Sequence, residues 1–319
     1  MVKVSVIIPN YNGEKFLTDC LNALKKQRFT DFDTILVDNG STDNSIKTSK
    51  NVCPDIKIIE LKENTGFAKA VNEGIKAAEG EFVILLNNDT IAFPGFVGNQ
   101  YSMIKNKPDV FSCSALMIQN HDHNKVDDAG DEYCALGWAF ALGKDKEVKN
   151  YLIPHEVFAA CGGAAIYRTR VLKELGMFDE KFFAYLEDID LAYRAKLHGY
   201  KNIYNPHARV YHVGSGSSGS RYNEFKIRLA ARNSMYLIRK NMPVWQLWLN
   251  APFIIFGVMV KMAFFTKKGY PDTYVKAIKE GLSDKNIKKN SKTNDVKMCI
   301  KMQKELYKGL YLFIKNKLS

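Results

Sequence analysis

Two patterns of apolar positions alternate along the first 95 residues. Short apolar-rich runs recur at Val4–Ile8, Thr34–Val37, Ile56–Leu61 and Gly80–Leu86. Between the runs, apolar residues recur every three to four positions, as in Phe16, Leu17, Cys20, Leu21 and Leu24, and again over Ala68–Ala78. The runs predict buried strands, and the spaced residues predict amphipathic helices. Strands that alternate with helices predict an α/β fold, with a mostly parallel sheet covered by helices on both faces.

Polar residues directly follow three of the predicted strands. Pro9–Asn12 come after the first strand, Asp38 after the second, and Asn87–Asp89 after the fourth. Ligands of such sheets bind beyond the carboxyl ends of the strands. We therefore expect one polar rim that brings Asp38 and Asp89 together. A carboxylate there is suited to holding Mg²⁺ or Mn²⁺ beside a ligand's phosphates, or it simply belongs to a turn.

A second acidic group follows the aromatic segment 178–185. It has the sequence Glu187-Asp-Ile-Asp190, and from Ile189 onward apolar residues recur at helical spacing. These acids therefore lie at the start of a predicted helix. One interpretation makes Asp188 a helix cap and leaves Asp190 in solvent beside Arg194, its i+4 partner. The other makes Asp188 a general base in a cleft.

The middle of the chain has weaker patterns. Strands are predicted at Val110–Met117, at Ala164–Tyr167 and within Asn202–His212. The small residues Cys161-Gly-Gly-Ala-Ala165 either frame an acceptor pocket or allow a helix to pack closely. His121 and His123 have no third metal ligand nearby in the sequence, so we assign them to a solvated loop.

A glycine-rich stretch occurs late in the chain. Gly214–Gly219 matches the pattern Gly-x-Gly-x-x-Gly of nucleotide-binding loops. It lacks the following strand and the acid about twenty residues on that such a site needs. We therefore predict a mobile loop that closes over a bound ligand, with a plain linker as the alternative.

Basic residues are concentrated in the last third of the chain. The whole chain carries 46 Lys and Arg against 34 Asp and Glu, a net charge of +12. Residues 221–319 hold 21 of these cations and 6 of the acids, net +15, whereas residues 1–220 hold 25 and 28, net −3. Such a region suits an anionic membrane surface or nucleic acid. Its pattern gives no sign of nucleic-acid readout, so we expect no nucleic-acid partner.

Three segments make up this basic region. A helix is predicted over residues 222–240, and the apolar run Val244–Phe265 follows it. Pro252 is expected to break that run, and the remaining helix would rise about 21 Å, short of the roughly 30 Å of a bilayer core. The final segment, Val296–Leu318, combines an apolar and a lysine stripe, so it either lies on an anionic membrane or docks on the protein with its lysines in water. The predicted apolar stripe consists of Ile300, Leu306, Tyr307, Leu310, Phe313 and Ile314.

The six cysteines are scattered, and none forms a Cys-x-x-Cys pair. This argues against a disulfide framework or a zinc ribbon, and it fits a reducing compartment. Together with the basic C-terminal region, this leads us to expect a cytoplasmic protein that associates peripherally with the inner face of the cell membrane.

Five motifs occur in order over about residues 3–240. They are Val4-Ser-Val-Ile-Ile-Pro-Asn-Tyr-Asn, Leu36-Val-Asp-Asn-Gly-Ser-Thr-Asp, Asn64-Thr-Gly-Phe-Ala, Leu86-Asn-Asn-Asp, and Gly176-Met-Phe-Asp-Glu-Lys-Phe-Phe with the subsequent Glu-Asp-Ile-Asp-Leu. In order and spacing they resemble family 2 glycosyltransferases of the GT-A fold, and among these the rhamnosyltransferases of bacterial polysaccharide assembly. The resemblance implies inverting transfer from a nucleotide-sugar donor to a glycan or lipid-linked glycan acceptor. dTDP-rhamnose is the expected donor, and a UDP-sugar is the alternative.

The resemblance also implies a role for each motif. Asp188 takes the place of the general base, with Glu187 in support. Asp89 takes the place of the metal-binding aspartate, and His212 that of a histidine that completes a Mg²⁺ or Mn²⁺ site. Asn87-Asn88-Asp89 departs from the family's Asp-x-Asp pattern and leaves one carboxylate for the metal. The residues implied to bind the nucleotide sugar are Pro9, Tyr11, Asp38, Asn64, Gly66 and Asn88.

The implied organisation has two parts. Residues 1–220 form the catalytic domain, with a donor half to about residue 95 and an acceptor half beyond it, and residues 221–319 form a helical, basic, membrane-associating region. A nucleotidyltransferase is disfavoured, because Pro9-Asn-Tyr-Asn-Gly13 is not a glycine-rich phosphate loop with a basic residue. A non-catalytic membrane scaffold is disfavoured by the joint presence of Asp89, Asp188 and His212.

Overall fold

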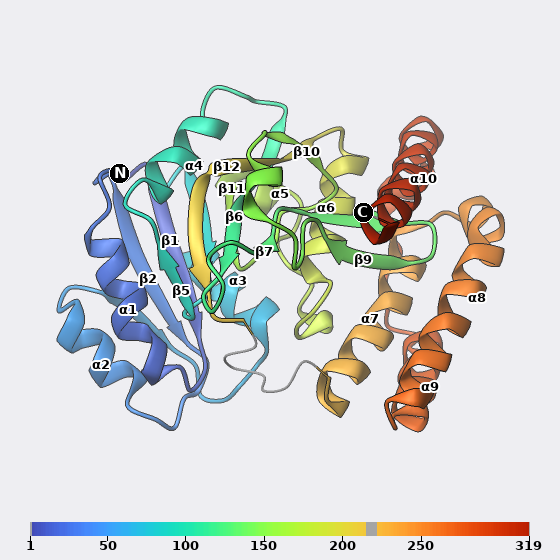
Figure 1. The fold of residues 1–319 in the computed structure, drawn as a ribbon, viewed down its shortest axis with the longest axis horizontal. Coiled ribbons are helices and arrows are strands. Elements are labelled where there is room, and N and C mark those ends of the chain that lie inside the picture. Colours follow the sequence, from blue (N-terminus) through green and yellow to red (C-terminus); the bar gives the residue numbers. More distant parts are fainter. Residues whose placement is uncertain (1, 215–221, 319) are drawn as a thin grey trace.

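A central mixed sheet organises the chain, of which the computed structural model describes residues 2–214 and 222–318. The strand order is β10-β12-β6-β11-β4-β1-β2-β3, with β5 paired to β12 and β7 to β6. Helices lie on both faces of the sheet, and the C-terminal helices stand together at one side of the molecule (Figure 1). The alternation of apolar patterns thus predicts the α/β class correctly.

The first half of the sheet is parallel, as predicted. It consists of β1 (Val4–Asn10), β2 (Phe32–Asp38), β3 (Lys57–Glu60) and β4 (Phe82–Leu86). The helices between these strands are α1 (Glu14–Lys25), α2 (Ser45–Val52) and α3 (Phe67–Ala77). Every side chain of β4 is buried, which explains why a central strand is a continuous apolar run. Asn10 and Asp38 are register partners at the ends of the adjacent strands β1 and β2, so the polar residues there reach the same rim of the sheet.

The second half of the sheet departs from the predicted parallel arrangement. β11 (Ala164–Arg168) runs antiparallel to both of its neighbours, β4 and β6 (Val110–Gln119). A strand that runs against its neighbours begins where they end, so Cys161–Gly163 lie at the rim where β4 ends. β12 (Lys201–His212) pairs with β5 (Thr90–Ala92) so that His212 lies opposite Thr90, next to Asp89. The sheet is completed by β7 (Val126–Asp128) and β10 (His155–Val157).

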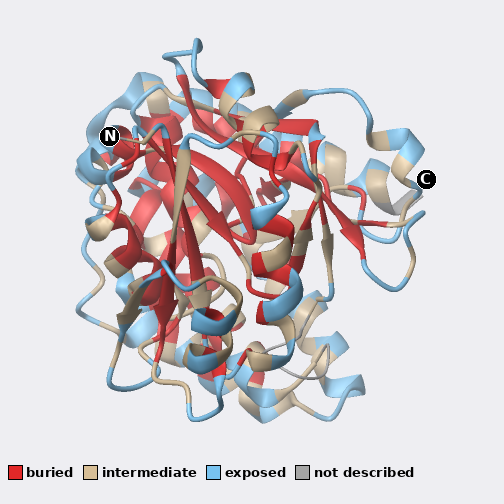
Figure 2. Ribbon diagram, turned by 90° about the vertical axis from the view of Figure 1, so that its left-hand side faces the viewer, coloured by how far each residue is buried: buried red, intermediate tan, exposed pale blue. Residues whose placement is uncertain are grey.

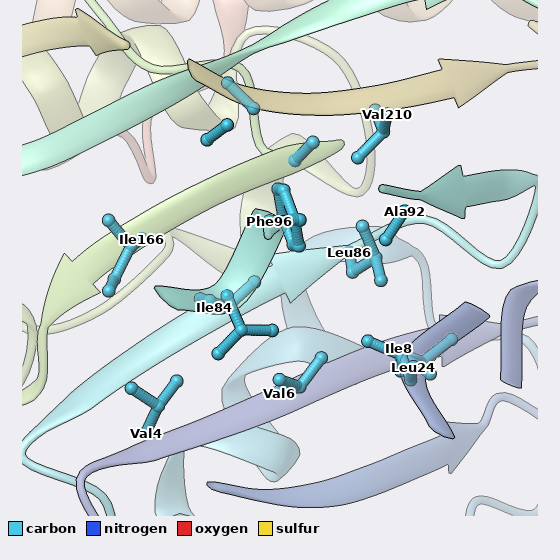
Figure 3. Packing of buried hydrophobic residues seen from close by; sticks show 14 of the residues in the cluster. Val4, Val6, Ile8, Leu24, Ile84, Leu86, Ala92, Phe96, Ile166 and Val210 are labelled. Atoms are coloured by element: carbon cyan, nitrogen blue, oxygen red, sulfur yellow. The ribbon is translucent and has the colours of Figure 1, made fainter. Parts of the chain in front are cut away.

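Two apolar layers hold the helices against the sheet. On one face, α1 and α4 (Phe96–Ile104) cover side chains such as Ile8 and Leu86 (Figure 3). On the other face, α3, α5 (Thr169–Glu174) and α6 (Glu187–Leu197) cover the opposite side of the same strands. Figure 2 shows the strands buried and the loops around them exposed. Polar groups therefore gather where the strands end.

The region after residue 221 forms four helices. These are α7 (Glu224–Asn241), α8 (Val244–Lys267), α9 (Pro271–Ser283) and α10 (Val296–Leu318). Their buried side chains share one core with the rest of the protein, for example Leu237 and Leu306 with Tyr193. The domain boundary near residue 220 stays a prediction. The remaining elements are the hairpin β8 (Asp131–Cys134) and β9 (Trp138–Ala141), and 3₁₀ turns at Val148–Tyr151, Glu180–Phe182 and Ser291–Asn294.

α8 corrects the expectation that Pro252 breaks the apolar run. The helix continues through Pro252 for 24 residues, about 36 Å at 1.5 Å per residue. Pro252 lies on the exposed side of α8, where the loss of one backbone hydrogen bond costs less than in a core. Among the described residues, α8 is the one helix that is long and apolar enough to cross a membrane by length and composition.

α10 docks on the protein through a stripe that overlaps the predicted one only in part, at Leu306 and Phe313. Cys299, Met302 and Leu306 are buried in the core shared with α6 and β8, whereas Ile300 and Tyr307 are exposed. The helix is apolar around much of its circumference, so spacing alone does not show which side meets the protein. One side of this helix thus docks on the protein and its lysines are exposed, and contact of those lysines with a membrane stays a prediction. The exposed lysines include Lys297, Lys301, Lys304 and Lys308.

The docked position of α10 leaves no room for a side chain at Gly309. A Cβ atom at this position would overlap the carbonyl oxygen of Tyr133. Alanine stabilises a free helix by about 1 kcal/mol relative to glycine, but overpacking costs about 1–3 kcal/mol. We expect Gly309→Ala to lower the free energy of unfolding in a urea titration, and Lys308→Ala to change it by less than about 0.5 kcal/mol. A stability increase in Gly309→Ala would contradict the docked position of α10.

Candidate functional site

A cleft with a volume of about 690 Å³ opens at the carboxyl ends of the strands. It is lined by residues from β1, the loop before α3, the end of β4, the start of α6 and the end of β12. Separate segments of the chain thus meet in one cavity. Nine of the ten predicted site residues line it: Pro9, Tyr11, Asn64, Gly66, Asn88, Asp89, Glu187, Asp188 and His212.

Asp38, the tenth predicted residue, lies behind the cleft surface. Its carboxylate is 2% exposed and accepts hydrogen bonds from Asn10 Nδ2 and from the backbone N–H of Ser41, each at 2.9 Å. Asn10 in turn accepts a hydrogen bond from the Asn88 amide at 2.7 Å. Asp38 thus does not line the cleft surface and instead holds Asn10 and the Ser41 turn in place, and its role toward the donor stays a prediction. Our sequence analysis did not single out Asn10, which does line the cleft.

Asp89 and His212 lie together in the cleft. Nε2 of His212 is 3.3 Å from Oδ1 of Asp89, and its Nδ1 is 2.7 Å from Oδ2 of Asp127, which Lys144 also contacts. Burial disfavours charge on His212, but the hydrogen bonds to Asp127 and Asp89 outweigh it and raise the imidazole pKa to about 9. Burial is likewise outweighed at Asp127, where His212 lowers the carboxyl pKa to about 2. The imidazole of His212 therefore lies between the carboxyl groups of Asp89 and Asp127.

Asp188 lines the same cleft from the first turn of α6. Its Oδ2 accepts a hydrogen bond from the Gly162 N–H at 3.3 Å, and its Oδ1 accepts one from the Ile189 N–H at 2.8 Å. Burial raises the pKa of this carboxyl, although the two N–H groups act in the opposite direction. Leu186, not Asp188, occupies the N-cap position, so the capping interpretation is wrong. A buried carboxyl with a raised pKa in a cleft is suited to proton transfer.

The segment before α6 has an uncommon backbone conformation. Phe183, Tyr185 and Leu186 have positive φ angles of 64°, 71° and 70°, a region that costs about 1–3 kcal/mol per residue. Asn233 of α7 stabilises the segment, because its side-chain amide donates hydrogen bonds to three backbone carbonyls. These are the carbonyls of Phe182, Ala184 and Tyr185, at 2.7–2.9 Å. α7 thereby supports the loop that delivers Asp188 to the cleft.

Gly66 and Glu187 adjoin this segment. Gly66 has φ 88°, and a Cβ atom there would lie 2.6 Å from the Phe183 carbonyl oxygen, so only glycine allows the close approach. Glu187 is 6% exposed, and its Oε2 has no hydrogen-bond partner in the described part of the chain. Burial and the neighbouring Asp188 raise the pKa of Glu187 well above its ordinary value. A second proton-binding group therefore lies beside Asp188.

Asp190 points into the protein and not into solvent. It is fully buried and accepts hydrogen bonds from Arg194 Nε and Lys240 Nζ, each at 2.9 Å, and from the Asn241 amide at 2.8 Å. The pairing with Arg194 confirms the i+4 prediction, whereas the prediction that Asp190 is solvated is wrong. Burial would raise its pKa, but the two cations and the amide outweigh burial and lower it. Residues two apart point about 200° from each other around a helix, so Asp188 faces the cleft and Asp190 the core.

A group of acids that no sequence pattern indicated lies beside Asp188. Asp128, Asp131 and Cys161 each place a ligand atom within 4.8 Å of the others, and Asp131 and Cys161 line the cleft. Burial, with repulsion between the carboxylates, raises the pKa of Asp128 to about 7 and that of Asp131 well above its ordinary value. Both acids lie in the weakly patterned region 96–175, where no motif distinguishes them. Cys161–Gly163 line the cleft, and their role in framing an acceptor pocket stays a prediction.

The structure tests the prediction for His123 but not the one for the glycine-rich loop. His123 is exposed and stacks on Tyr211, with 3.9 Å between ring centroids, in agreement with a solvated loop. The glycine loop that we predict to close over a ligand lies, beyond Gly214, outside the described residues. Its role stays a prediction.

The motifs around this cleft match a known family. Residues 5–176, more than half of the chain, match the family model described as glycosyl transferase family 2. The chain belongs to glycosyl transferase family 2. The matched range includes the predicted donor residues and Asp89, and it ends before Asp188 and His212.

Curated relatives in this family are similar over limited stretches. The chain is 40% identical over 94 residues to the poly(ribitol-phosphate) β-N-acetylglucosaminyltransferase TarS of Staphylococcus aureus, covering 28% of this chain and 16% of that protein. It is 25% identical over 195 residues to the uncharacterized glycosyltransferase RT0329 of Rickettsia typhi, covering 60% and 58%. The chain spans less than two thirds of the length of the curated relatives that it matches.

Solved structures share the fold. The fragment 1–349 of S. aureus TarS in complex with UDP superposes with a TM-score of 0.57 at 19% identity, over 98% of this chain and 88% of that chain. GalNAc-T7 with UDP, GalNAc and Mn²⁺ superposes with a TM-score of 0.61 at 17% identity, over 75% and 48%. At these identities the likeness shows the fold alone, and it confirms the GT-A fold.

Proposed function

We propose that the protein is an inverting glycosyltransferase that moves a sugar from a nucleotide-diphosphate donor to a hydroxyl group of a glycan. One observation carries the proposal: a single cleft is lined both by the carboxyl of Asp188, whose pKa is raised, and by the Asp89–His212 pair. Proton transfer and diphosphate binding are the two tasks that such a reaction requires. Family membership supports the class of reaction.

In the proposed mechanism, Asp188 accepts the proton of the acceptor hydroxyl while the hydroxyl oxygen attacks the anomeric carbon. The bond from that carbon to the diphosphate breaks, the diphosphate leaves with the electron pair, and the configuration inverts. The N–H groups of Gly162 and Ile189 orient the carboxylate. Burial keeps it basic enough to take the proton, and Glu187 beside it is assigned a supporting role.

The residues around Asp89 fit a divalent metal, Mg²⁺ or Mn²⁺. A carboxylate and an imidazole face each other at 3.3 Å, and Asp127 holds the other imidazole nitrogen, an arrangement usual behind metal-binding histidines. The imidazole favours Mn²⁺, because Mg²⁺ prefers oxygen ligands. A metal held by Asp89 and His212 supplies positive charge for the leaving diphosphate. GalNAc-T7 and a mannosyltransferase from Pyrobaculum calidifontis were solved with Mn²⁺.

Asp127 is expected to position His212 for this metal. Asp127→Asn removes the carboxylate that holds Nδ1, and such changes typically cost about 10–100-fold in metal affinity or activity. We expect the Kd for Mn²⁺, measured by calorimetry, to rise by that factor while the circular dichroism spectrum stays unchanged. Asp55→Asn, in an exposed turn, is the matched control. If Asp127→Asn binds Mn²⁺ as wild type does, Asp127 has no such role.

The proposed donor is dTDP-rhamnose, which the likeness of the motifs to rhamnosyltransferases favours. The alternative is a UDP-hexose or another UDP-sugar, which is favoured by the name of TarS and by its structure in complex with UDP-GlcNAc. Calorimetry with a panel of nucleotide sugars, with and without Mn²⁺, tests this choice. A metal-dependent preference for dTDP-rhamnose supports the first donor, and a preference for a UDP-sugar supports the second. Failure to bind any nucleotide sugar contradicts the enzymatic proposal.

We further propose that the acceptor is a lipid-linked or growing polysaccharide at the cytoplasmic face of the cell membrane. Two relatives carry names that refer to poly(ribitol-phosphate) and to teichoic acid. The net charge of +15 in residues 221–319 supports contact with an anionic surface. A non-catalytic membrane scaffold would keep that contact but would release no nucleotide from a donor sugar, so donor hydrolysis separates the two hypotheses.

A further inference from the structure

α8 presents an apolar face to solvent along its whole length. The exposed positions recur every three to four residues and carry large apolar side chains, with Trp248 78% and Met259 63% exposed. Soluble monomers rarely expose a contiguous apolar patch of this extent. The residues that define this outer face are Trp245, Trp248, Leu249, Ile255, Phe256 and Met259.

Most polar residues of α8 before its last turn lie on its inner side. Gln246 and Asn250 are fully buried and donate hydrogen bonds to Gln303 of α10, at 3.1 and 2.8 Å. Lys261, the one charged residue between positions 244 and 266, lies over the ring of Trp138. The inner side of α8 also packs apolar residues against the core, such as Phe253 and Val258. A helix on the surface of a soluble protein instead carries polar residues on its outer face. The outer face of α8 is therefore built to contact something apolar.

α10 extends the outer face of α8 and adds a basic border. The ring of Tyr307 lies 6.0 Å from that of Phe253 on α8, and Ile300 and Tyr311 on the same side of α10 are exposed. Farther around α10 lies the row of exposed lysines, and α8 itself ends in two more, Lys267 and Lys268. An apolar strip bordered by lysines is complementary to the boundary between the acyl chains and the anionic headgroups of a bilayer.

The helices on either side of α8 argue against a transmembrane crossing. α7 precedes α8 and α9 follows it, yet these two helices pack on each other. Arg228 of α7 pairs with Glu280 of α9 at 3.0 Å, and Arg239 of α7 donates to the Gly281 carbonyl at 2.6 Å. A crossing would place the two ends of α8, and so α7 and α9, on opposite sides of the bilayer. α8 therefore does not cross a bilayer in this fold.

We propose that the outer face of α8, with the adjoining side of α10, is a membrane-binding surface that lies in the plane of an anionic bilayer. Trp245, Trp248 and Phe256 enter the headgroup boundary, and the lysines of α10 contact the headgroups. This surface holds the cleft next to a membrane, where a lipid-linked acceptor would arrive. A second copy of the chain is the competing occupant, but a symmetric dimer through this face would bring the same lysine rows together. Membrane binding by this surface is independent of which sugar the enzyme transfers.

Cosedimentation with lipid vesicles tests this surface in the full chain. The vesicles contain phosphatidylcholine with or without phosphatidylglycerol. The double variant Trp248→Ser and Phe256→Ser removes two exposed rings without touching the core, and Ile153→Ser, at a side chain that is 77% exposed before β10, is the matched control. We expect the double variant to bind anionic vesicles at least about tenfold more weakly than wild type, and Ile153→Ser to bind as wild type does.

Brominated lipid should quench the tryptophan fluorescence of bound wild type, because two of its three tryptophans lie on this face.

Three results would contradict the proposal that this surface binds a membrane. They are no binding of wild type to anionic vesicles, equal binding by wild type and the double variant, and no quenching by brominated lipid. A wild-type dimer in light scattering that the double variant abolishes without losing vesicle binding would assign the face to a second copy. Nucleotide release with a soluble acceptor is measured in parallel and should be the same in wild type and the double variant. Its absence in wild type would contradict the proposed activity and leave the vesicle result standing, so the two failures are distinguishable.

Discussion

Asp188→Asn is expected to lower kcat on the order of 10²–10⁴-fold, the share of the rate that a general base supplies. Asparagine keeps the size of the side chain but does not accept the proton of the acceptor hydroxyl. Donor affinity should stay nearly intact, because the donor contacts proposed for Pro9, Tyr11 and Asp89 come from other segments. Nucleoside-diphosphate release measures kcat, and calorimetry measures the donor Kd. Near-normal turnover would remove Asp188 from the role of base.

The pH profile of the same variant provides a second readout. Burial raises the pKa of Asp188, and the base acts only when it is unprotonated. Wild-type kcat/KM should therefore fall as the pH drops through this raised pKa, at a higher pH than an exposed aspartate would give. The residual rate of Asp188→Asn should lack this fall. An acidic limb that persists unchanged in the variant would assign the titration to another group.

Asp190→Asn, two residues away, is expected to affect stability and not the chemistry. The carboxylate of Asp190 is fully buried between Arg194 and Lys240, so its loss leaves Arg194 without a carboxylate partner among the described residues and leaves Lys240 with Asp179 alone. Removal of one partner from a buried ion pair costs about 3–5 kcal/mol. The free energy of unfolding from urea titration should fall by that amount, while the folded fraction keeps its donor Kd.

A matched control for Asp190→Asn comes from the surface of α5. Glu174 and Arg170 are also four residues apart, at 3.6 Å, but both are exposed. Glu174→Gln should therefore change the free energy of unfolding by no more than about 1 kcal/mol. Equal losses in Asp190→Asn and Glu174→Gln would contradict the buried-pair account of Asp190.

The parallel half of the sheet could be predicted from the sequence because the burial of each strand determines which residues that strand contains. A strand buried on both faces must be apolar throughout, and β4 is buried at every position. The polar rim follows from the same logic, since Asp89 comes directly after β4. The spacing of Asp190 and Arg194 likewise predicts their contact, because helix geometry brings positions i and i+4 together.

Features that depend on contacts distant in the sequence could not be predicted in this way. β11 is antiparallel because it fills the gap between β4 and β6, and nothing within Ala164–Arg168 encodes that direction. Whether Asp190 is solvated depends on Lys240, fifty positions away. Asp128 and Asp131 become neighbours of Asp188 only through tertiary packing, and no local pattern distinguishes them from surface acids.

The C-terminal helices show a third limit of local patterns. The spacing of Val296–Leu318 predicts the helix α10 correctly, but its buried side contains Cys299 and Met302 and not Ile300. α8 is apolar enough to be a core helix by composition, yet it also exposes large apolar side chains along its length. Hydrophobicity identifies these segments, and only the packing shows what each side contacts.

Release of nucleoside diphosphate from a panel of nucleotide sugars, with Mn²⁺ or with a chelator, tests the central claim most directly. We expect wild type to release nucleoside diphosphate from at least one donor when Mn²⁺ is present, and the chelator to abolish this release. Asp188→Asn should bind the same donor without turning it over. Failure of folded, Mn²⁺-loaded wild type to release nucleotide from any donor, with or without glycan acceptors, would contradict the central claim.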